Sequence, residues 1–538
     1  MKQWLAFSLL GVLITITAAL GSPVAGRAAS SGGKSPVAFV DPGVQADLRT
    51  LEPQETTSII VKLRDQANLM AARGPNRAAR LESVVKLLRA KADSSQQDMR
   101  AFLEEKLRRG DVKELVPLWI FNGLAVTATR DVVLELATRP DVLSIIPDRT
   151  ILEPAMGAAG AADTTPPEAS LTVIEAPAIW DLGFRGQGVV VANMDSGVDV
   201  NHPDLAAQWR GGSNSWFDPN GQHPSVPTDV SGHGTWTMGV LAGGDSGGTD
   251  IGVAPSSRWI AVKIFDDSGT ARVSRIHAGF QWLLDPDGNP ATPDAPHVVN
   301  NSWGFASPGC DLEFQPDLQA LRAALITPVF AAGNQGQAAA TSVSPANYPE
   351  ALAVSATDNS DALYPYSSRG PSACGEPETT YPEVTAPGVS IRTSDLYGGY
   401  IPATGTSLAA PHVAGALAVL ISAFPDVPPA QLEAALLATA VDLGLPAPDN
   451  DYGNGRIDVQ AAFQWLSAQY GTPVLAGDVD CDHTVSMADA SLIADSVIGL
   501  APSLPCPEGA DASRDGQTAM ADALLVARVA AGLIGWFP

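Results

Sequence analysis

The central part of the sequence, from about residue 171 to residue 470, alternates short apolar runs with glycine-bounded stretches of helical character. The runs are GVVVANM, RWIAVKIF, HVVNNSW, PVFAAGN and EALAVSAT. Continuous runs of Val, Ile and Ala, without the alternation of a half-exposed strand, are typical of parallel strands buried on both faces. Because parallel strands need crossover connections, the pattern predicts helices on both faces of the sheet. We therefore expect an α/β fold with a doubly wound, mostly parallel sheet over 170–470.

A smaller unit is expected on the N-terminal side, over 50–152. TSIIVKL indicates a strand, residues 77–110 a long amphipathic helix, and PLWIFNGLAVTAT a strand pair that turns at Asn122 and Gly123. DVVLELATRPDVLSIIPD indicates a helix followed by a strand. Together these elements predict a small α+β domain. Residues 153–168 are rich in Gly, Ala and Pro and are expected to form a linker.

The N-terminus has the three parts of a secretory signal peptide. Lys2 supplies a positive charge, residues 5–20 are apolar, and small residues follow around 26–28. A membrane anchor is the alternative, but the apolar run is short and contains two threonines. We expect a signal peptide over 1–28 that is removed, a secreted, extracellular protein, and no membrane span after its removal.

Charge is unevenly distributed along the chain, whose net charge is -26. Residues 30–150 are near neutral, whereas residues 151–538 contain 12 Lys and Arg against 42 Asp and Glu. Phosphate contacts need clustered basic side chains, so this composition argues against nucleic-acid binding. It suits an extracellular protein, expected to be a monomer, or one that holds cations. An acidic surface that only keeps the chain in solution is the simpler alternative.

Export permits disulfide bonds, and the chain has four cysteines. They lie as two couples along the sequence, Cys310 with Cys374 and Cys481 with Cys506. Pairing within each couple is the simplest of the three possible connectivities.

Three motifs of the central part carry chemically useful side chains at expected strand-to-helix junctions. Asp195 follows an apolar strand, His233 stands between two glycines at a helix start, and Ser407 heads another helix. In an open α/β sheet such junctions converge at the carboxyl ends of the strands. A serine hydroxyl is a weak nucleophile until a base takes its proton, which His233 would do while Asp195 fixes its tautomer.

These motifs resemble those of the subtilisin family of serine proteases. DSGVD, HGT and GTSLAAPHVAG occur in the family's order Asp–His–Ser, and RWIAVKIF with HVVNNSWG is most similar to its bacillopeptidase F branch. The resemblance covers roughly 170–465 and implies an endopeptidase that needs no cofactor for its chemistry. It implies that Asn334, in AAGNQG, belongs to the oxyanion hole. It also implies that Ser302, Trp303 and Gly304 lie along protein or peptide substrates as an edge strand, opposite a strand near Gly269.

The sequence departs from the family at a few positions. Leu408 replaces the usual methionine after the nucleophile, and Trp236 stands where a smaller or polar residue is usual; we expect both to act in packing. Asp204 matches a calcium ligand of the family, but the loop that supplies the other ligands is not clearly equivalent, so a surface turn is the alternative. A disulfide between Cys310 and Cys374 would pin loops that flank the substrate pocket.

The N-terminal unit resembles the inhibitory propeptide of the same family. Such a segment acts as a folding template and fills the cleft until it is cut, which would happen here near 150–168. Its near-neutral charge against the acidic remainder is compatible with electrostatic docking. An unrelated α/β cap is the alternative.

The C-terminal residues 476–538 contain two similar acidic loops, DVDCDHTVSMAD at 478–489 and DASRDGQTAMAD at 511–522, each followed by an apolar helix. Their spacing matches a calcium loop with ligands at positions 1, 3, 5, 7 and 12. The expected ligands are Asp478, Asp480, Asp482, Thr484 and Asp489 in the first loop, and Asp511, Ser513, Asp515, Gln517 and Asp522 in the second. His483 replaces the usual loop glycine, which Gly516 keeps in the second loop.

Two such units resemble a type I dockerin, a small all-α module that binds two calcium ions. The resemblance implies a cohesin-type partner. A calcium-stabilised cap on the protease, or a merely solvated acidic tail, are the alternatives for this segment. For the whole chain, a non-catalytic extracellular adhesin or scaffold component on the same fold is the alternative to an enzyme.

Overall fold

The computed structural model of the protein describes residues 38–154, 167–376, 379–501, 503–513, 516–534 and 537. The expected signal peptide (1–28), most of the expected linker and the expected ligand Asp515 lie outside the described residues.

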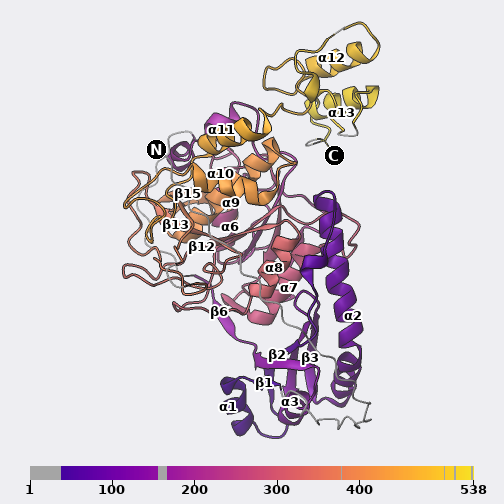
Figure 1. Cartoon of the computed structure of the whole chain (residues 1–538), viewed down its shortest axis with the longest axis vertical. Helices are drawn as coiled ribbons and strands as arrows, with labels where there is room; N and C mark the ends of the chain where they lie inside the picture. The colour runs from indigo at the N-terminus through magenta and orange to yellow at the C-terminus, as the bar shows by residue number, and fades with distance from the viewer. Residues whose placement is uncertain are drawn as a thin grey trace, which may run out of the picture. The chain divides into compact units, whose positions relative to one another are not determined.

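A seven-stranded sheet forms the middle of the central part (Figure 1), and all of its paired strands are parallel. Its order is β14-β13-β12-β11-β7-β9-β8. The strands are β7 (Val190–Asp195), β8 (Trp216–Phe217), β9 (Arg258–Lys263), β11 (Val298–Asn301), β12 (Thr327–Ala331), β13 (Leu352–Thr357) and β14 (Val384–Pro387). Each of the five apolar runs overlaps one strand, so the parallel sheet predicted from sequence is confirmed.

Helices cover both faces of this sheet. Successive side chains of a buried strand point to opposite faces, and they therefore pack in two different cores. Val191 of β7 packs in the core that contains α6, α9, α10 and α11, whereas Ala192 packs in the core that contains α7 and α8. These helices are α6 (His233–Ala242), α7 (Val273–Leu284), α8 (Gln315–Ala323), α9 (Thr406–Ala423), α10 (Pro429–Ala438) and α11 (Val459–Tyr470). Shorter elements are α4 (Ala169–Val173), α5 (Ala176–Trp180), and a ribbon of β15 (Ile391–Ser394) and β16 (Tyr400–Ala403).

Within the described part of the chain, α9 alone has the length and hydropathy that a membrane span would require. However, 94% of it is buried inside the protein. It contacts β11, β12, β13 and β14 and is therefore a core helix of the sheet.

The order of the strands reverses at β7. β7 lies in the sheet between β9 and β11. After β7 the chain adds β8 and β9 on one side of it, and then crosses to the other side to add β11, β12, β13 and β14. Such a reversal opens a crevice at the carboxyl ends of the strands, where ligands bind in open α/β sheets. Asp195 is the last residue of β7, and the fold therefore places it at this crevice.

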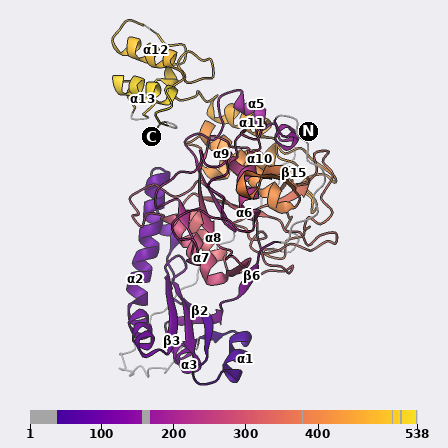
Figure 2. The ribbon, with the colours of Figure 1, turned by 180° about the vertical axis from the view of Figure 1, so that it is seen from behind.

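The N-terminal segment forms a second, five-stranded sheet of order β1-β5-β2-β4-β3. Its elements are β1 (Phe39–Val40), α1 (Pro42–Thr50), β2 (Thr56–Leu63), a 3-10 turn (Leu69–Ala71), α2 (Arg77–Arg109), β3 (Val112–Leu118), β4 (Gly123–Thr129), α3 (Arg130–Ala137) and β5 (Val142–Pro147). The unit begins before the expected residue 50, because β1 pairs in parallel with β5 and α1 contacts the same strand. Helix α2 runs beside α8 of the central part (Figures 1 and 2).

The C-terminal segment consists of two loop–helix units with a core of their own. Helices α12 (Met487–Val497) and α13 (Met520–Ala530) pack on each other around Ile493 and Val526, with a 3-10 turn (Pro507–Gly509) between them. Both expected trailing helices are therefore present, and the segment contains no strand in its described residues.

Candidate active site

The expected catalytic aspartate and histidine are in contact. His233 is the first residue of α6, and its Nδ1 lies 2.7 Å from Oδ1 of Asp195. Both side chains are almost completely buried. Burial by itself would lower the pKa of His233, but the Asp195 carboxylate raises it above its ordinary value, with a smaller contribution from Glu153. The pair therefore favours the imidazolium form.

The expected nucleophile lies at the start of the core helix. Ser407 is the second residue of α9 and is only 2% exposed. Its hydroxyl donates to the carbonyl of Ser302 at 3.3 Å, and the hydroxyl of Ser302 in turn donates to the carbonyl of Ser407 at 2.8 Å. Nε2 of His233 is buried and has no hydrogen-bond partner among the described residues. The histidine nitrogen that would accept a proton is thus unoccupied by a protein donor.

The amide group of Asn334 is fixed by the residue before the serine. Its Oδ1 accepts hydrogen bonds from both the backbone N–H and the hydroxyl of Thr406, each at 3.0 Å. With the oxygen held in this way, the amide nitrogen remains available as a donor. Asn334, Thr406 and Ser407 all line one cavity of about 310 Å³.

The end of the N-terminal segment lies in the same cavity. Strand β6 (Thr150–Leu152) pairs antiparallel with β10 (Thr270–Arg272), and the backbone N–H of Glu153 donates to the carbonyl of Gly269 at 2.9 Å. Leu152, Glu153 and Pro154 line the cavity together with Ser407. Burial, together with the nearby carboxylates of Asp195 and Asp229, raises the pKa of Glu153 above its ordinary value.

The other expected substrate-binding residues follow β11. Ser302, Trp303 and Gly304 line the cavity, but they lie beyond the end of the strand and form no edge strand. The Trp303 ring is 2% exposed and packs against Phe314 and Phe330. The segment is held from the other side, since the backbone N–H of Phe305 donates to the carbonyl of Ser344. Among the described residues of the cavity, the strand after Gly269, β10, is the one that pairs with another strand, β6.

A buried carboxylate that the sequence analysis did not single out holds the start of α6. Asp229 accepts hydrogen bonds from the backbone N–H groups of Ser231, Gly232 and Thr235, and from the hydroxyls of Thr235 and Ser196. The residue directly before α6 is Gly232, whereas Asp229 lies outside the position at which a capping side chain is recognised in a sequence, which is why sequence reasoning missed it.

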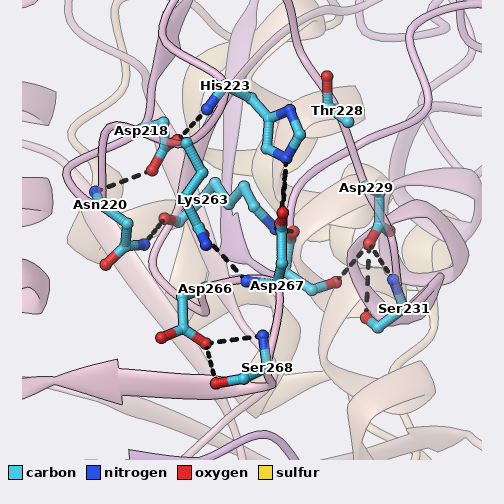
Figure 3. A network of polar contacts seen from close by, with 12 residues as sticks. Asp218, Asn220, His223, Thr228, Asp229, Ser231, Lys263, Asp266, Asp267 and Ser268 are labelled. Carbon is cyan, nitrogen blue, oxygen red and sulfur yellow. Dashed lines mark hydrogen bonds and ion pairs between the residues drawn. The ribbon is translucent and has the colours of Figure 1, made fainter.

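Beside this cap, a buried lysine supports the loop after Asp195 (Figure 3). Lys263, at the end of β9, donates to the carbonyl of Ser196 at 2.7 Å and lies 3.3 Å from Asp267. His223 approaches the same Asp267 carboxylate at 3.0 Å. The network therefore joins the end of β9 and the loop before α6 to Ser196, the residue that follows Asp195.

The residues at the two departures from the family pattern act in packing. Leu408 is completely buried in a small core with Val240 and Ile391. Trp236 packs against this core and donates from Nε1 to Asp395 at 2.7 Å.

Both carboxylate oxygens of Asp204 accept hydrogen bonds from protein donors. Its Oδ1 accepts from the backbone N–H of Ser246 at 2.5 Å, and its Oδ2 accepts from the hydroxyl of Tyr400 at 2.6 Å. Among the described residues, the groups of acidic ligands close enough to share a metal do not include it. Protein donors, rather than a set of further carboxylates, thus surround the expected calcium ligand.

The acidic loops of the C-terminal segment have matching backbone conformations. Asp489 accepts from the backbone N–H groups of Asp480 and Ser486, and Asp522 accepts from those of the equivalent residues Ser513 and Ala519. His483 has a φ of 67° and Gly516 a φ of 87°, so the histidine adopts the left-handed conformation of the usual loop glycine. One ligand atom each of Asp478, Asp480 and Asp489 lies within 4.8 Å of the others, a spacing that could hold a metal ion.

The remaining expected ligands take other contacts or lie at the loop surface. Asp482 accepts from the backbone N–H of Thr484, and Ser513 donates to Asp511 at 3.3 Å. Gln517 is exposed. Both disulfides join cysteines within the couples that the sequence suggested, Cys310–Cys374 and Cys481–Cys506.

Comparison with known proteins places this geometry in context. Residues 186–455 match the model of the subtilase family. The chain is 34% identical over 467 residues to bacillopeptidase F of Bacillus subtilis (strain 168), which covers 78% of this chain and 32% of that protein. It is 34% identical to subtilisin E of the same organism over 64% of this chain and 81% of that protein. It is 36% identical to the subtilisin of Bacillus pumilus over 55% of this chain and 98% of that protein. The chain thus spans about a third of the length of bacillopeptidase F but most of the length of the two subtilisins.

Proposed function

Because the chain belongs to the subtilase family, its central domain is a subtilisin-like serine endopeptidase, and we propose that Ser407, His233 and Asp195 carry out its hydrolysis of protein substrates. The single observation that supports these roles best is the buried contact of 2.7 Å between Nδ1 of His233 and Oδ1 of Asp195, which leaves Nε2 of His233 without a hydrogen-bond partner among the described residues.

In the proposed reaction, the Ser407 hydroxyl exchanges its bond to Ser302 for one to Nε2 of His233 when substrate is bound. His233 takes the proton as Oγ attacks the scissile carbonyl, and Asp195 stabilises the imidazolium that forms. The imidazolium then protonates the leaving amine, which leaves an acyl-enzyme. Water attacks this ester with His233 again as the base, so that the serine is regenerated.

The negative charge that develops on the carbonyl oxygen needs donors that are already oriented. Asn334 is the proposed donor, because Thr406 holds its carbonyl oxygen with two hydrogen bonds and thereby orients the amide nitrogen. The start of α9 adds the positive end of the helix dipole.

We propose that the N-terminal segment is an inhibitory propeptide. Supporting this, its β6 occupies the edge of β10, and Pro154 lies in the same cavity as Ser407. Ion pairs join it to the central domain at separate points: Lys62 with Glu313, Arg89 with Asp285, Arg149 with Asp311, and Glu114 with Arg275. The expected cut then falls at or just after Pro154, within the range expected from the sequence.

We further propose that the protein is secreted and that its two C-terminal loops bind calcium. The C-terminal segment, in its calcium-bound form, would then attach the protein to a cohesin-type partner. The calcium proposal is supported by the hydrogen bonds that equivalent residues of the two loops make to Asp489 and Asp522, and by the spacing of Asp478, Asp480 and Asp489. Calcium titration of the full chain with Ser407→Ala should lose one ion when Asp489→Asn is added. An unchanged number of bound ions would contradict the first loop.

A serine-directed acylating inhibitor tests the catalytic proposal. The purified protein should be labelled at Ser407, and labelling should abolish cleavage of casein. The Ser407→Ala variant is the matched control and should neither label nor cleave. If the unmodified protein leaves casein whole and Ser407 unlabelled, the non-catalytic alternative holds instead.

A further inference from the structure

The loop between α7 and β11 brings three aspartates together outside the active site. Its sequence is DPDGNPATPD, from Asp285 to Asp294. One ligand atom from each of Asp285, Asp287 and Asp294 lies within 4.8 Å of the others. Oxygens that surround one calcium ion at 2.3–2.6 Å are at most about 5 Å apart, so the three atoms are close enough to share an ion.

Two of these carboxylates are buried with an oxygen that no protein donor reaches. Asp285 is 5% exposed and Asp294 is 8% exposed. Among the described residues, Oδ1 of each is buried and has no hydrogen-bond partner. A buried carboxylate oxygen without a partner is costly, unless a cation compensates for the lost water.

The other oxygens of these carboxylates are already engaged, which fixes the two side chains. Asn214 donates from Nδ2 to Oδ2 of Asp294 at 2.9 Å. Arg89 of the N-terminal segment lies 2.6 Å from Oδ2 of Asp285 and also donates to the carbonyl of Gly288. Each carboxylate thus has one oxygen in contact with a protein cation or donor and one oxygen that accepts no hydrogen bond from the described residues.

The positive charge around the cluster is less than its negative charge. Arg210 donates to the backbone carbonyl of Asp294 rather than to its carboxylate, which leaves Arg89 as the cation that pairs with a carboxylate of the cluster. Burial, with the nearby charges of Asp294 and Asp287, raises the pKa of Asp285 to about 6 even though Arg89 lowers it. The three side chains repel one another in the absence of a further cation.

We propose that Asp285, Asp287 and Asp294 form a binding site for a divalent cation of the calcium class, separate from the loops of the C-terminal segment. Carboxylate oxygens are hard ligands, which favour calcium over the softer transition metals. Because Arg89 contacts the same Asp285 carboxylate, the ion and this arginine oppose each other, and the site binds more tightly when the arginine is absent.

The number of bound ions tests this proposal. The full chain carrying Ser407→Ala, which prevents self-cleavage, is freed of metal with a chelator and dialysed to equilibrium against radioactive calcium. Asp294→Asn and Asp287→Asn should each bind one ion fewer per chain than the parent. Asp426→Asn removes an equal charge at an exposed position and is the matched control, so it should bind the same number as the parent.

The proposal fails if both loop variants keep the ion count of the parent, or if Asp426→Asn loses an ion as well. Asp287 is exposed, so its variant keeps the test decisive even if Asp294→Asn does not fold. In the same background, Arg89→Gln should tighten the binding of one ion several-fold. An unchanged or weaker affinity in that variant would place the ion away from Asp285.

Discussion

At the scale of single residues, the proposed roles of His233 and Asn334 depend on the neighbours that set the charge of one and the orientation of the other. Asp195 raises the pKa of His233, while Thr406 orients the amide of Asn334. The two effects have different signatures, because one changes a protonation equilibrium and the other a transition-state contact. Each therefore leads to its own prediction.

Replacing Asp195 by Asn should change both the rate and its pH dependence. The neutral imidazole is the active base, so kcat/KM rises as pH increases through the pKa of His233. Without the carboxylate this pKa falls, so the acidic limb of the profile should move to lower pH. The turnover should fall by about 10⁴-fold, since the tautomer is no longer fixed. A limb that stays in place, measured with a peptide substrate from pH 4 to 9, would contradict this assignment.

Replacing Asn334 by Ala should lower kcat by about 10²–10³-fold with little change in KM, as the loss of one such donor did in a subtilisin. The reason is that the donor acts on charge that exists only in the transition state. Steady-state kinetics on a peptide substrate measure both constants. A rise in KM at constant kcat would instead assign Asn334 to substrate binding.

At the scale of elements, the start of α6 is held by a carboxylate that does not itself react. The Asp229→Ala variant should lose several of the hydrogen bonds that fix this helix end. We expect a free energy of unfolding lower by about 1–3 kcal/mol and a reduced kcat, because His233 is the first residue of the helix. Thermal unfolding and kinetics test the two effects separately. A fully active variant would show that α6 is positioned by packing alone.

The contact between the N-terminal segment and helices α7 and α8 should depend on pH. Buried His277 lies 2.8 Å from Asp317 and 3.2 Å from Glu313, and Glu313 also pairs with Lys62 at 3.2 Å. Burial opposes protonation, but the two carboxylates raise the pKa of His277 to about 9. The protonated His277 therefore adds to the free energy of unfolding. This contribution is fully present below about pH 6.5 and is lost as the pH rises through about 9.

The Ser407→Ala chain should therefore unfold at a lower temperature at pH 9.5 than at pH 6.5, with at most about 3 kcal/mol lost from the free energy of unfolding. Adding His277→Gln should flatten this dependence. If the double variant shows the same decline as the single one, other groups carry the effect.

At the scale of the whole molecule, the parallel sheet and the convergence of Asp195 and His233 could be predicted, because buried strands and helix starts leave strong local signals. The two-residue strand β8 is too short to show any periodicity, and β1 and α1 lie outside the unit expected from residue 50. Trp303 lines the cavity that contains Ser407, as expected from the sequence, but the packing of its ring against Phe314 and Phe330 depends on distant segments and has no local signal. Contacts between distant segments, such as Arg89 with Asp285, have no signal in the local sequence.

The pairing of β6 with β10 also determines the kinetic order of the proposed maturation. Because Pro154 and Ser407 of one chain line the same cavity, the first cut is expected to be intramolecular. Its half-time should then stay constant when the precursor is diluted 100-fold, as measured by electrophoresis of quenched samples. A half-time that lengthens on dilution would mean that one molecule cuts another. Dilution would therefore give the newly made precursor no protection from its own active site.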